Sequence, residues 1–261
     1  AVLGDLLNGS GGEPVVLERL GKTGQDLHAF EPSAADIRKL SGADILICIG
    51  SFAETWLDGA IRASGNRPLR VLSMTDVCEL HEEEGLPGLG EHDHHHDHEH
   101  GEGTQVEYDE HVWTSFGNMA RIVTAVRDTL TAALPEQAAT LQANAASYLL
   151  ELDALRADYQ ATVASATDPV LVIADRYPFA YLMRELGVVC YAAFPGCSSE
   201  TQASFSTQVM LTETVRDLHL PAVLYVDFGV ASVADAVSRA TGVPVRRLWS
   251  GQVASDTGLS Y

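Results

Sequence analysis

Histidine and carboxylate side chains alternate along residues 91–100, whose sequence is EHDHHHDHEH. Neutral imidazole and carboxylate are ligands that Zn²⁺ and similar borderline cations prefer, and a His-rich tract offers many interchangeable coordination sets. The acids between the histidines set this segment apart from a purification tag. It therefore predicts auxiliary capture of metal ions, and the alternative is a solvated acidic loop. The histidines concerned are His92, His94, His95, His96, His98 and His100.

The charge of the chain also favours cations as partners. Its 261 residues carry 36 acids against 16 bases, a formal net charge of −20. Such a surface repels phosphate backbones and anionic membranes, so we expect no nucleic-acid partner. The apolar runs are strand-sized, far below the roughly 18 to 20 residues of a membrane span. No basic segment precedes an apolar stretch, so we expect any signal peptide to have been removed or to lie outside this sequence.

Short β-rich runs alternate with helical patterns, which is typical of parallel sheets flanked by helices. Ser33 followed by Asp36 predicts a helix start. The acidic stretch 79–103 predicts a long loop, and loops of that length are usually either functional or disordered. The expected strands are residues 14–17, 44–49, 70–73, 170–175, 188–194, 222–228 and 243–249.

A single long helix is predicted to follow Pro135, a residue suited to a first helical turn. Apolar residues recur at helical spacing for nearly thirty residues, which at about 1.5 Å per residue gives roughly 40 Å. We interpret it as a connecting helix (134–166) between an N-terminal α/β lobe (1–133) and a C-terminal α/β lobe (167–261). The alternative is a surface helix on one domain. The apolar positions are Leu141, Ala145, Tyr148, Leu152, Leu155, Tyr159 and Val163.

Outside the His-rich segment, His28 and His111 each lie in a loop that leads into a helical pattern. Such loops line the edge of an open α/β sheet where ligands bind. A lone loop histidine is more often simply solvated, so the residues alone leave both readings open. A ligating imidazole needs its second ring nitrogen held, and Glu31, Asp109 and Glu110 are near enough in sequence to do this.

The chain resembles the zinc- and manganese-specific solute-binding proteins of ABC transporters over nearly its whole length. The resemblance is carried by residues 27–33 (LHAFEPS) and 109–113 (DEHVW), by the acidic His-rich loop between them, and by the long helix with a second lobe after it. It implies two α/β lobes joined by one rigid helix, with the ion held between them and ligated by His28 and His111. It also implies an extracytoplasmic, periplasmic or lipid-anchored, monomeric protein that delivers metal to a membrane permease and is not an enzyme.

One family ligand is missing from this sequence. The third ligand, a histidine or glutamate after the first strand of the second lobe, falls on Arg176, and a guanidinium has no lone pair to give. We predict Glu200 as the replacement, with Asp175 and Asp227 as the next candidates. An aspartate near the C-terminus, the last family ligand, has no counterpart before Asp256. His28, His111 and Glu200 are thus the predicted metal ligands.

The abundance of histidine favours Zn²⁺, with Mn²⁺ as the alternative for an oxygen-rich site. Two other function classes are alternatives: a zinc-dependent hydrolase, which the absence of an HExxH motif disfavours, and a metal-buffering surface protein. The sequence leaves open whether Cys190 pairs with Cys197. The first strand and last helix usual in the family are not evident, so we expect a trimmed fragment.

Overall fold

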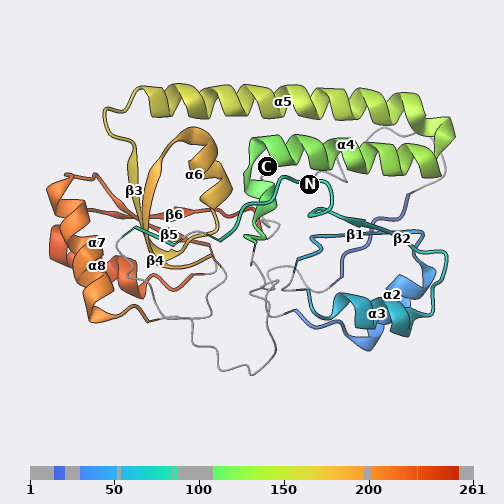
Figure 1. Ribbon diagram of the computed structural model, residues 1–261, viewed down its shortest axis with the longest axis horizontal. Helices are drawn as coiled ribbons and strands as arrows, with labels where there is room; N and C mark the ends of the chain where they lie inside the picture. The colour runs from blue at the N-terminus through green and yellow to red at the C-terminus, as the bar shows by residue number, and fades with distance from the viewer. Residues whose placement is uncertain are drawn as a thin grey trace. The chain divides into compact units, whose positions relative to one another are not determined.

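The computed structural model describes residues 15–20, 30–51, 54–83, 85–87, 108–196, 202–227 and 229–252. The chain divides into two compact units (Figure 1). Unit 1 comprises Ala1–Glu79, Val112–Ala161 and Gly251–Tyr261, and unit 2 comprises Leu80–His111 and Thr162–Ser250. Each unit contains a parallel sheet and helices, which confirms the predicted α/β fold class.

In unit 1, β1 (Ile45–Cys48) and β2 (Arg70–Ser73) form a parallel pair. Two helices, α2 (Ala34–Gly42) and α3 (Leu57–Ser64), pack with the strands through a small apolar cluster. The start of α2 is the predicted one. Ser33 accepts the Asp36 N–H, and the Asp36 carboxylate accepts the Ser33 N–H, so two donors at the helix end are satisfied.

The long helix is also present. A short 3₁₀ turn, η3 (Pro135–Gln137), leads into α5 (Ala138–Ala164), whose 27 residues correspond to about 40 Å. Before it, η2 (Val112–Thr114) and α4 (Phe116–Ala133) bring the chain to this turn. Helices α4 and α5 run antiparallel to each other (Figure 1), with the ring of Phe116 5.6 Å from that of Tyr159.

Unit 2 is built on a four-stranded parallel sheet in the order β4-β3-β5-β6. The strands are β3 (Val170–Arg176), β4 (Val189–Phe194), β5 (Val223–Val226) and β6 (Val245–Leu248). The helices between them are α6 (Ala180–Leu186), α7 (Phe205–Asp217) and α8 (Ser232–Thr241). The order places the ends of three strands, β3, β4 and β5, beside one another.

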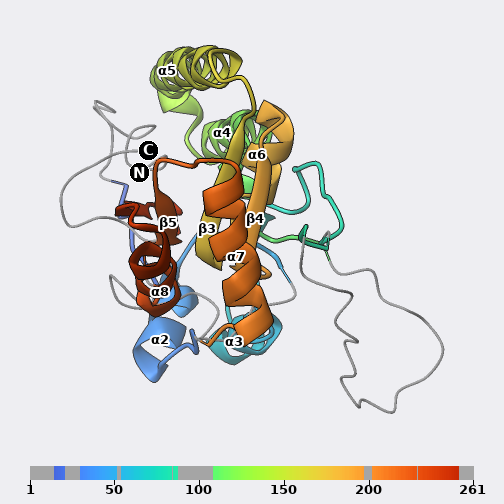
Figure 2. The ribbon, with the colours of Figure 1, turned by 90° about the vertical axis from the view of Figure 1, so that its left-hand side faces the viewer.

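Alternate residues of β3 face two different cores. Val172 and Ala174 pack with α7 and α8, which lie side by side in Figure 2, whereas Ile173 packs with Phe179 and Met183 around α6. The sheet is therefore covered on both faces, as expected for parallel strands. Among the described residues, no helix is long and apolar enough to cross a membrane.

One expected strand differs from the structure. Residues 15–17 of the strand expected at 14–17 are not in a strand, Val16 and Leu17 are exposed, and no described strand pairs with this apolar run. Among the described residues after Glu79, Leu86 is buried in the core around α6 of unit 2. The division into a lobe at 1–133, a connecting helix at 134–166 and a lobe at 167–261 stays a prediction.

Candidate metal centre

The candidate site lies at the carboxyl edge of the unit 2 sheet. In a parallel sheet all strands end at the same edge, and ligands of open α/β sheets bind there. Tyr177 follows β3 and Gly196 follows β4; Gly196 lies against the imidazole of His111 and against the Tyr177 carbonyl. His111 is 1% exposed, so it is not the solvated loop histidine of the alternative reading.

Asp109 holds the imidazole of His111. Its Oδ1 lies 2.7 Å from His111 Nδ1 and also accepts the His111 main-chain N–H over 2.8 Å. An ionised carboxylate only accepts hydrogen bonds, so Nδ1 carries the proton and donates it. The lone pair is then on Nε2, which is the nitrogen that coordinates a metal in such carboxylate–histidine pairs. Of the three acids proposed as imidazole partners, the structure assigns this role at His111 to Asp109.

Gly196 allows the imidazole to lie where it does. A Cβ added at Gly196 would be 3.1 Å from His111 Cε1, 3.3 Å from His111 Nδ1 and 3.0 Å from the Tyr177 carbonyl oxygen. These separations are shorter than the roughly 3.5 to 4.0 Å of an optimal carbon contact. The close approach of the His111 imidazole therefore requires a residue without a side chain at position 196.

Residues 81–83 and 108–109, here called the neck, flank the acidic His-rich segment 91–100 in the sequence and contact each other. Glu82 and Tyr108 form an antiparallel bridge, and the Asp109 N–H donates to the His81 carbonyl over 3.0 Å. The neck thus ends two residues before His111. Arg184 Nη1 lies 3.1 Å from His81 Nδ1, and because a guanidinium only donates, this imidazole nitrogen accepts.

Asp175 and Asp227, the reserve candidates, end neighbouring strands and are both buried. Asp175 accepts the N–H of Arg176 over 2.8 Å through Oδ1 and the N–H of Val226 over 3.1 Å through Oδ2. It therefore ties β3 to β5 where their ladder ends. Gly229 lies against this carboxylate, because a Cβ there would be 1.5 Å from Asp175 Oδ2.

Asp227 is satisfied on one side only. Its Oδ1 accepts the Ser250 N–H over 2.7 Å, but Oδ2 is buried with no hydrogen-bond partner in the described structure. A buried carboxylate oxygen without a partner is unfavourable, and an ion or a water molecule is the usual explanation. Burial raises the pKa of Asp175, and the charge of the neighbouring Asp227 raises it further. The N–H donors of Arg176 and Val226 and the charge of Arg176 lower it.

Thiolate ligands are not indicated by the described cysteines. Cys48, Cys78 and Cys190 are free thiols, and Cys197, the other half of the Cys190 pairing left open above, lies outside the described residues. Burial raises the pKa of Cys48 and of Cys78 to about 11 and that of Cys190 to about 12. Metal binding requires the thiolate, and these groups stay protonated at neutral pH.

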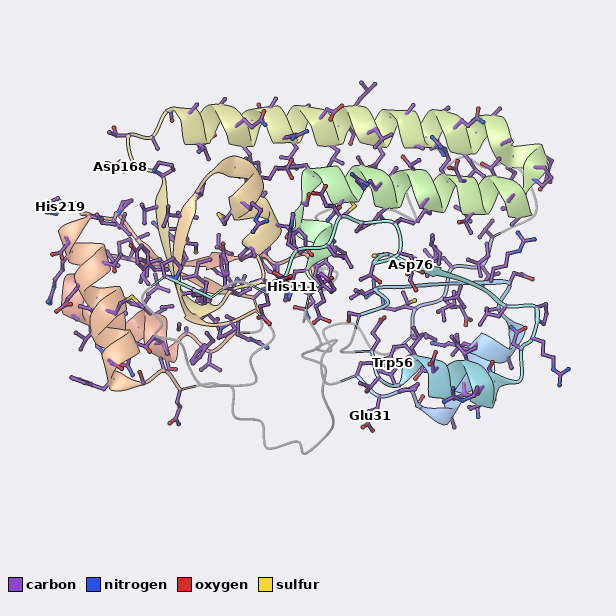
Figure 3. The ribbon with its side chains drawn as sticks, in the orientation of Figure 1. Glu31, Trp56, Asp76, His111, Asp168 and His219 are labelled. Atoms are coloured by element: carbon purple, nitrogen blue, oxygen red, sulfur yellow. The ribbon has the colours of Figure 1, made fainter. Side chains whose placement is uncertain are left out.

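Of the predicted ligands, the structure describes His111 alone; His28, Glu200 and the six histidines of 91–100 lie outside the described residues. Within the described ranges, no group of three or more His, Cys, Asp or Glu side chains is arranged to hold an ion. His219 directly follows the C-cap of α7 and lies far from His111 in Figure 3. Sequence reasoning missed Gly196 and Tyr181. A glycine directly after a strand signals close backbone approach, whereas nothing in the sequence marks Tyr181.

Comparison with known proteins identifies the family. The model of the family described as "Zinc-uptake complex component A periplasmic" (ZnuA) matches residues 1–261. The chain belongs to this family. Its members are metal-binding components of uptake systems and not enzymes, which confirms the predicted resemblance.

Individual relatives agree with this assignment. The chain is 28% identical to the zinc-binding lipoprotein AdcA of Streptococcus pneumoniae over 232 residues, which cover 89% of this chain and 45% of AdcA. It is 24% identical to the manganese-binding lipoprotein MntA of Halalkalibacterium halodurans, covering 98% of this chain and 77% of MntA. The chain thus spans less than half the length of AdcA.

The fold is that of solved metal-binding proteins. The periplasmic zinc-binding protein TroA from Treponema pallidum superposes with a TM-score of 0.76 at 21% identity, covering 99% of this chain and 87% of TroA. At this identity the likeness supports the fold alone.

Proposed function

We propose that this protein captures Zn²⁺ outside the cytoplasm and delivers it to the permease of an ABC transporter. The observation that carries the proposal is the buried His111, whose Nδ1 is held by Asp109 at the carboxyl edge of a parallel sheet. This pair fixes both the tautomer and the direction of the imidazole, which is the arrangement found around ligating histidines. Family membership supplies the transport context.

The proposed ligands are His28, His111 and Glu200. Zn²⁺ in a tetrahedral site needs a fourth donor, and Asp227 is the described carboxylate best suited to supply it, because its Oδ2 is buried and has no partner. Asp175 is less suited, since each of its oxygens already accepts a main-chain N–H. The histidines of 91–100 serve as an auxiliary site that raises the local supply of the ion.

We propose Zn²⁺ over Mn²⁺ because the chain is rich in histidine and because its relative AdcA is described as a zinc-binding lipoprotein. Manganese remains the second candidate, since MntA is also a relative and carboxylate oxygens suit Mn²⁺. Anomalous scattering above and below the zinc and manganese edges, from a crystal grown with both ions, distinguishes them. Anomalous signal at the manganese edge alone would show that the bound ion is Mn²⁺ instead of Zn²⁺.

We further propose a monomer anchored to or held near the membrane surface, as the lipoprotein relatives AdcA and MntA suggest.

A nanomolar dissociation constant corresponds to roughly 12 kcal/mol, so the permease must disturb the coordination set for the ion to leave. Loss of growth under zinc limitation on deletion of the gene, reversed by added zinc, supports transport. Normal growth would favour the metal-buffering alternative.

The ligand assignment is tested by competition between the protein and a chromophoric zinc chelator. His28→Ala and His111→Ala should each weaken the tight site at least about tenfold, the lower range for damage to a metal site. His219→Ala is the matched control, because it removes a histidine of unit 2 at the end of α7. Wild-type affinity in His111→Ala would refute the assignment.

The auxiliary segment is tested by deleting residues 91–100. Calorimetric titration with Zn²⁺ should show a lower stoichiometry with the tight phase retained, because the proposed ligands lie elsewhere in the sequence. Disappearance of the tight phase would make the His-rich segment itself the primary site.

A further inference from the structure

The hydroxyl of Tyr181 joins the two sides of the neck. Tyr181 lies in α6 and is 4% exposed. Its Oη donates to the Asp109 carbonyl over 2.7 Å and accepts the His81 N–H over 3.1 Å. Together with the Asp109 N–H to His81 carbonyl bond, these contacts satisfy four main-chain groups of the neck, the N–H and C=O of both Asp109 and His81.

Helix α6 also holds His81 by its side chain. The rings of Tyr181 and His81 lie 5.2 Å apart between centroids, and Arg184, one helical turn on, reaches His81 Nδ1 over 3.1 Å. Residues three apart on a helix share a face, so both contacts come from one side of α6. The neck is therefore fixed to the helix rather than only closed on itself.

Asp109 connects this attachment to His111. The carbonyl of Asp109 accepts the Tyr181 hydroxyl, while Oδ1 of the same residue holds both the N–H and Nδ1 of His111. A shift of the Asp109 main chain would therefore carry the imidazole with it. The direction of the Nε2 lone pair then depends on the hydrogen bond between the Tyr181 hydroxyl and the Asp109 carbonyl.

We propose that Tyr181 is a positioning residue of the metal site, acting through Asp109 to direct the His111 imidazole. The inference rests on the proposed function, because it takes His111 as a ligand. Coordination requires the lone pair to point at the ion, and groups that orient a ligating histidine typically contribute about 10- to 100-fold in metal affinity. Tyr181 acts one residue further away, so we expect a value near the lower limit.

The test is Tyr181→Phe in the full chain, with zinc affinity measured by chelator competition. The ring and its packing on His81 are kept, and only the hydroxyl is lost. We expect affinity to fall about tenfold. Tyr225→Phe in β5 is the control, since the described structure gives its hydroxyl no hydrogen bond, and it should stay within about twofold of wild type.

A double-mutant cycle separates positioning from general stability. If Tyr181 acts through Asp109, Tyr181→Phe should have little further effect in an Asp109→Asn background, so the losses would not add. Ring ¹⁵N resonances of His111 in the metal-free protein, assigned by their absence in His111→Ala, should also change in Tyr181→Phe. Additive losses together with unchanged resonances would overturn the proposal.

Two outcomes separate this inference from the function on which it rests. If His111→Ala removes tight binding but Tyr181→Phe behaves like Tyr225→Phe, the positioning role alone is wrong. If His111→Ala binds zinc like wild type, the ligand assignment fails first. Should Tyr181→Phe not fold, 3-fluorotyrosine at position 181 keeps both hydrogen bonds with altered acidity. It should then shift the His111 ring resonances, and unchanged resonances would overturn the proposal.

Discussion

Substitution of Gly196 by alanine should weaken metal binding by displacing the imidazole of His111. The added Cβ would lie 3.1 Å from Cε1 and 3.3 Å from Nδ1 of His111, and 3.0 Å from the carbonyl of Tyr177. An optimal carbon contact is about 3.5 to 4.0 Å, so the ring must move by a few tenths of an ångström. The Tyr177 carbonyl is backbone and yields less easily than a side chain.

That movement acts directly on the carboxylate contact. The Nδ1 to Asp109 distance is 2.7 Å, and Nδ1 is one of the two ring atoms that the new methyl group would press against. Overpacking of a buried site costs about 1 to 3 kcal/mol of stability. Disturbance of the group that orients a ligand lowers metal affinity by about 10- to 100-fold, equivalent to about 1.4 to 2.7 kcal/mol.

The assay is chelator competition with Zn²⁺, together with thermal unfolding of the metal-free protein. Gly59→Ala is the control, because a Cβ at this α3 position meets nothing within 4 Å. Alanine is the better helix former, so Gly59→Ala should raise stability by up to about 1 kcal/mol and leave zinc affinity unchanged. Affinity in Gly196→Ala within about twofold of wild type would refute the argument that this approach positions the ligand.

Three further predictions concern stability. Burial raises the pKa of Cys190 from 9.0 to about 12. The stability that the neutral buried thiol contributes is therefore fully present below pH 9 and is lost as the pH rises towards 12. The stability advantage of wild type over Cys190→Ala in urea should therefore shrink above pH 9 by up to about 1.4 kcal/mol per pH unit, and a constant difference would contradict this. Gly229→Ala should destabilise unit 2 by at least about 1 to 3 kcal/mol in urea unfolding, because its Cβ would overlap Asp175 Oδ2 at 1.5 Å; near-wild-type stability would show that the carboxylate can move away. Asn66→Ala should destabilise unit 1 by about 1 to 3 kcal/mol in the same assay, since Nδ2 donates to the carbonyls of Leu40 and Ala43 over 2.7 Å each, whereas an unchanged midpoint would mean that water replaces both bonds.

The elements that the sequence predicted well have local causes. The start of α2 follows from Ser33 and Asp36, whose side chains satisfy the helix end without help from distant residues. The bounds of β2 were predicted as observed, and α5 follows Pro135 as expected. Apolar spacing and capping residues specify such elements because the hydrogen bonds concerned are made within a few residues.

The strand expected at residues 14–17 shows where such patterns fail. An apolar run needs a neighbouring strand to satisfy its backbone groups and a core to bury its side chains. Val16 is 77% exposed and Leu17 55% exposed, so the run has neither. A pattern of four residues contains no information on whether a partner strand is available.

The candidate site was predictable only in part. The motif around residues 109–113 marked His111, and proximity in sequence suggested Asp109 as its partner, which the structure bears out. The approach of Gly196 to His111 and the bond of Tyr181 to Asp109 were not predictable, because each joins residues more than 70 positions apart in the chain. The placement of segment 80–111 in unit 2 has the same origin, since Tyr181 and Arg184 hold its neck.

By itself, the sequence determined the α/β class, the long helix, the acidic His-rich segment and the family, because each is encoded by composition or by spacing within one stretch of chain. Only the tertiary structure decided which atoms surround His111. The residues that position its imidazole come from the neck, from α6 and from the loop after β4, and chain folding alone brings them together. A sequence motif can identify a candidate metal-ligating residue. The direction of its lone pair depends on packing between segments that are distant in the sequence.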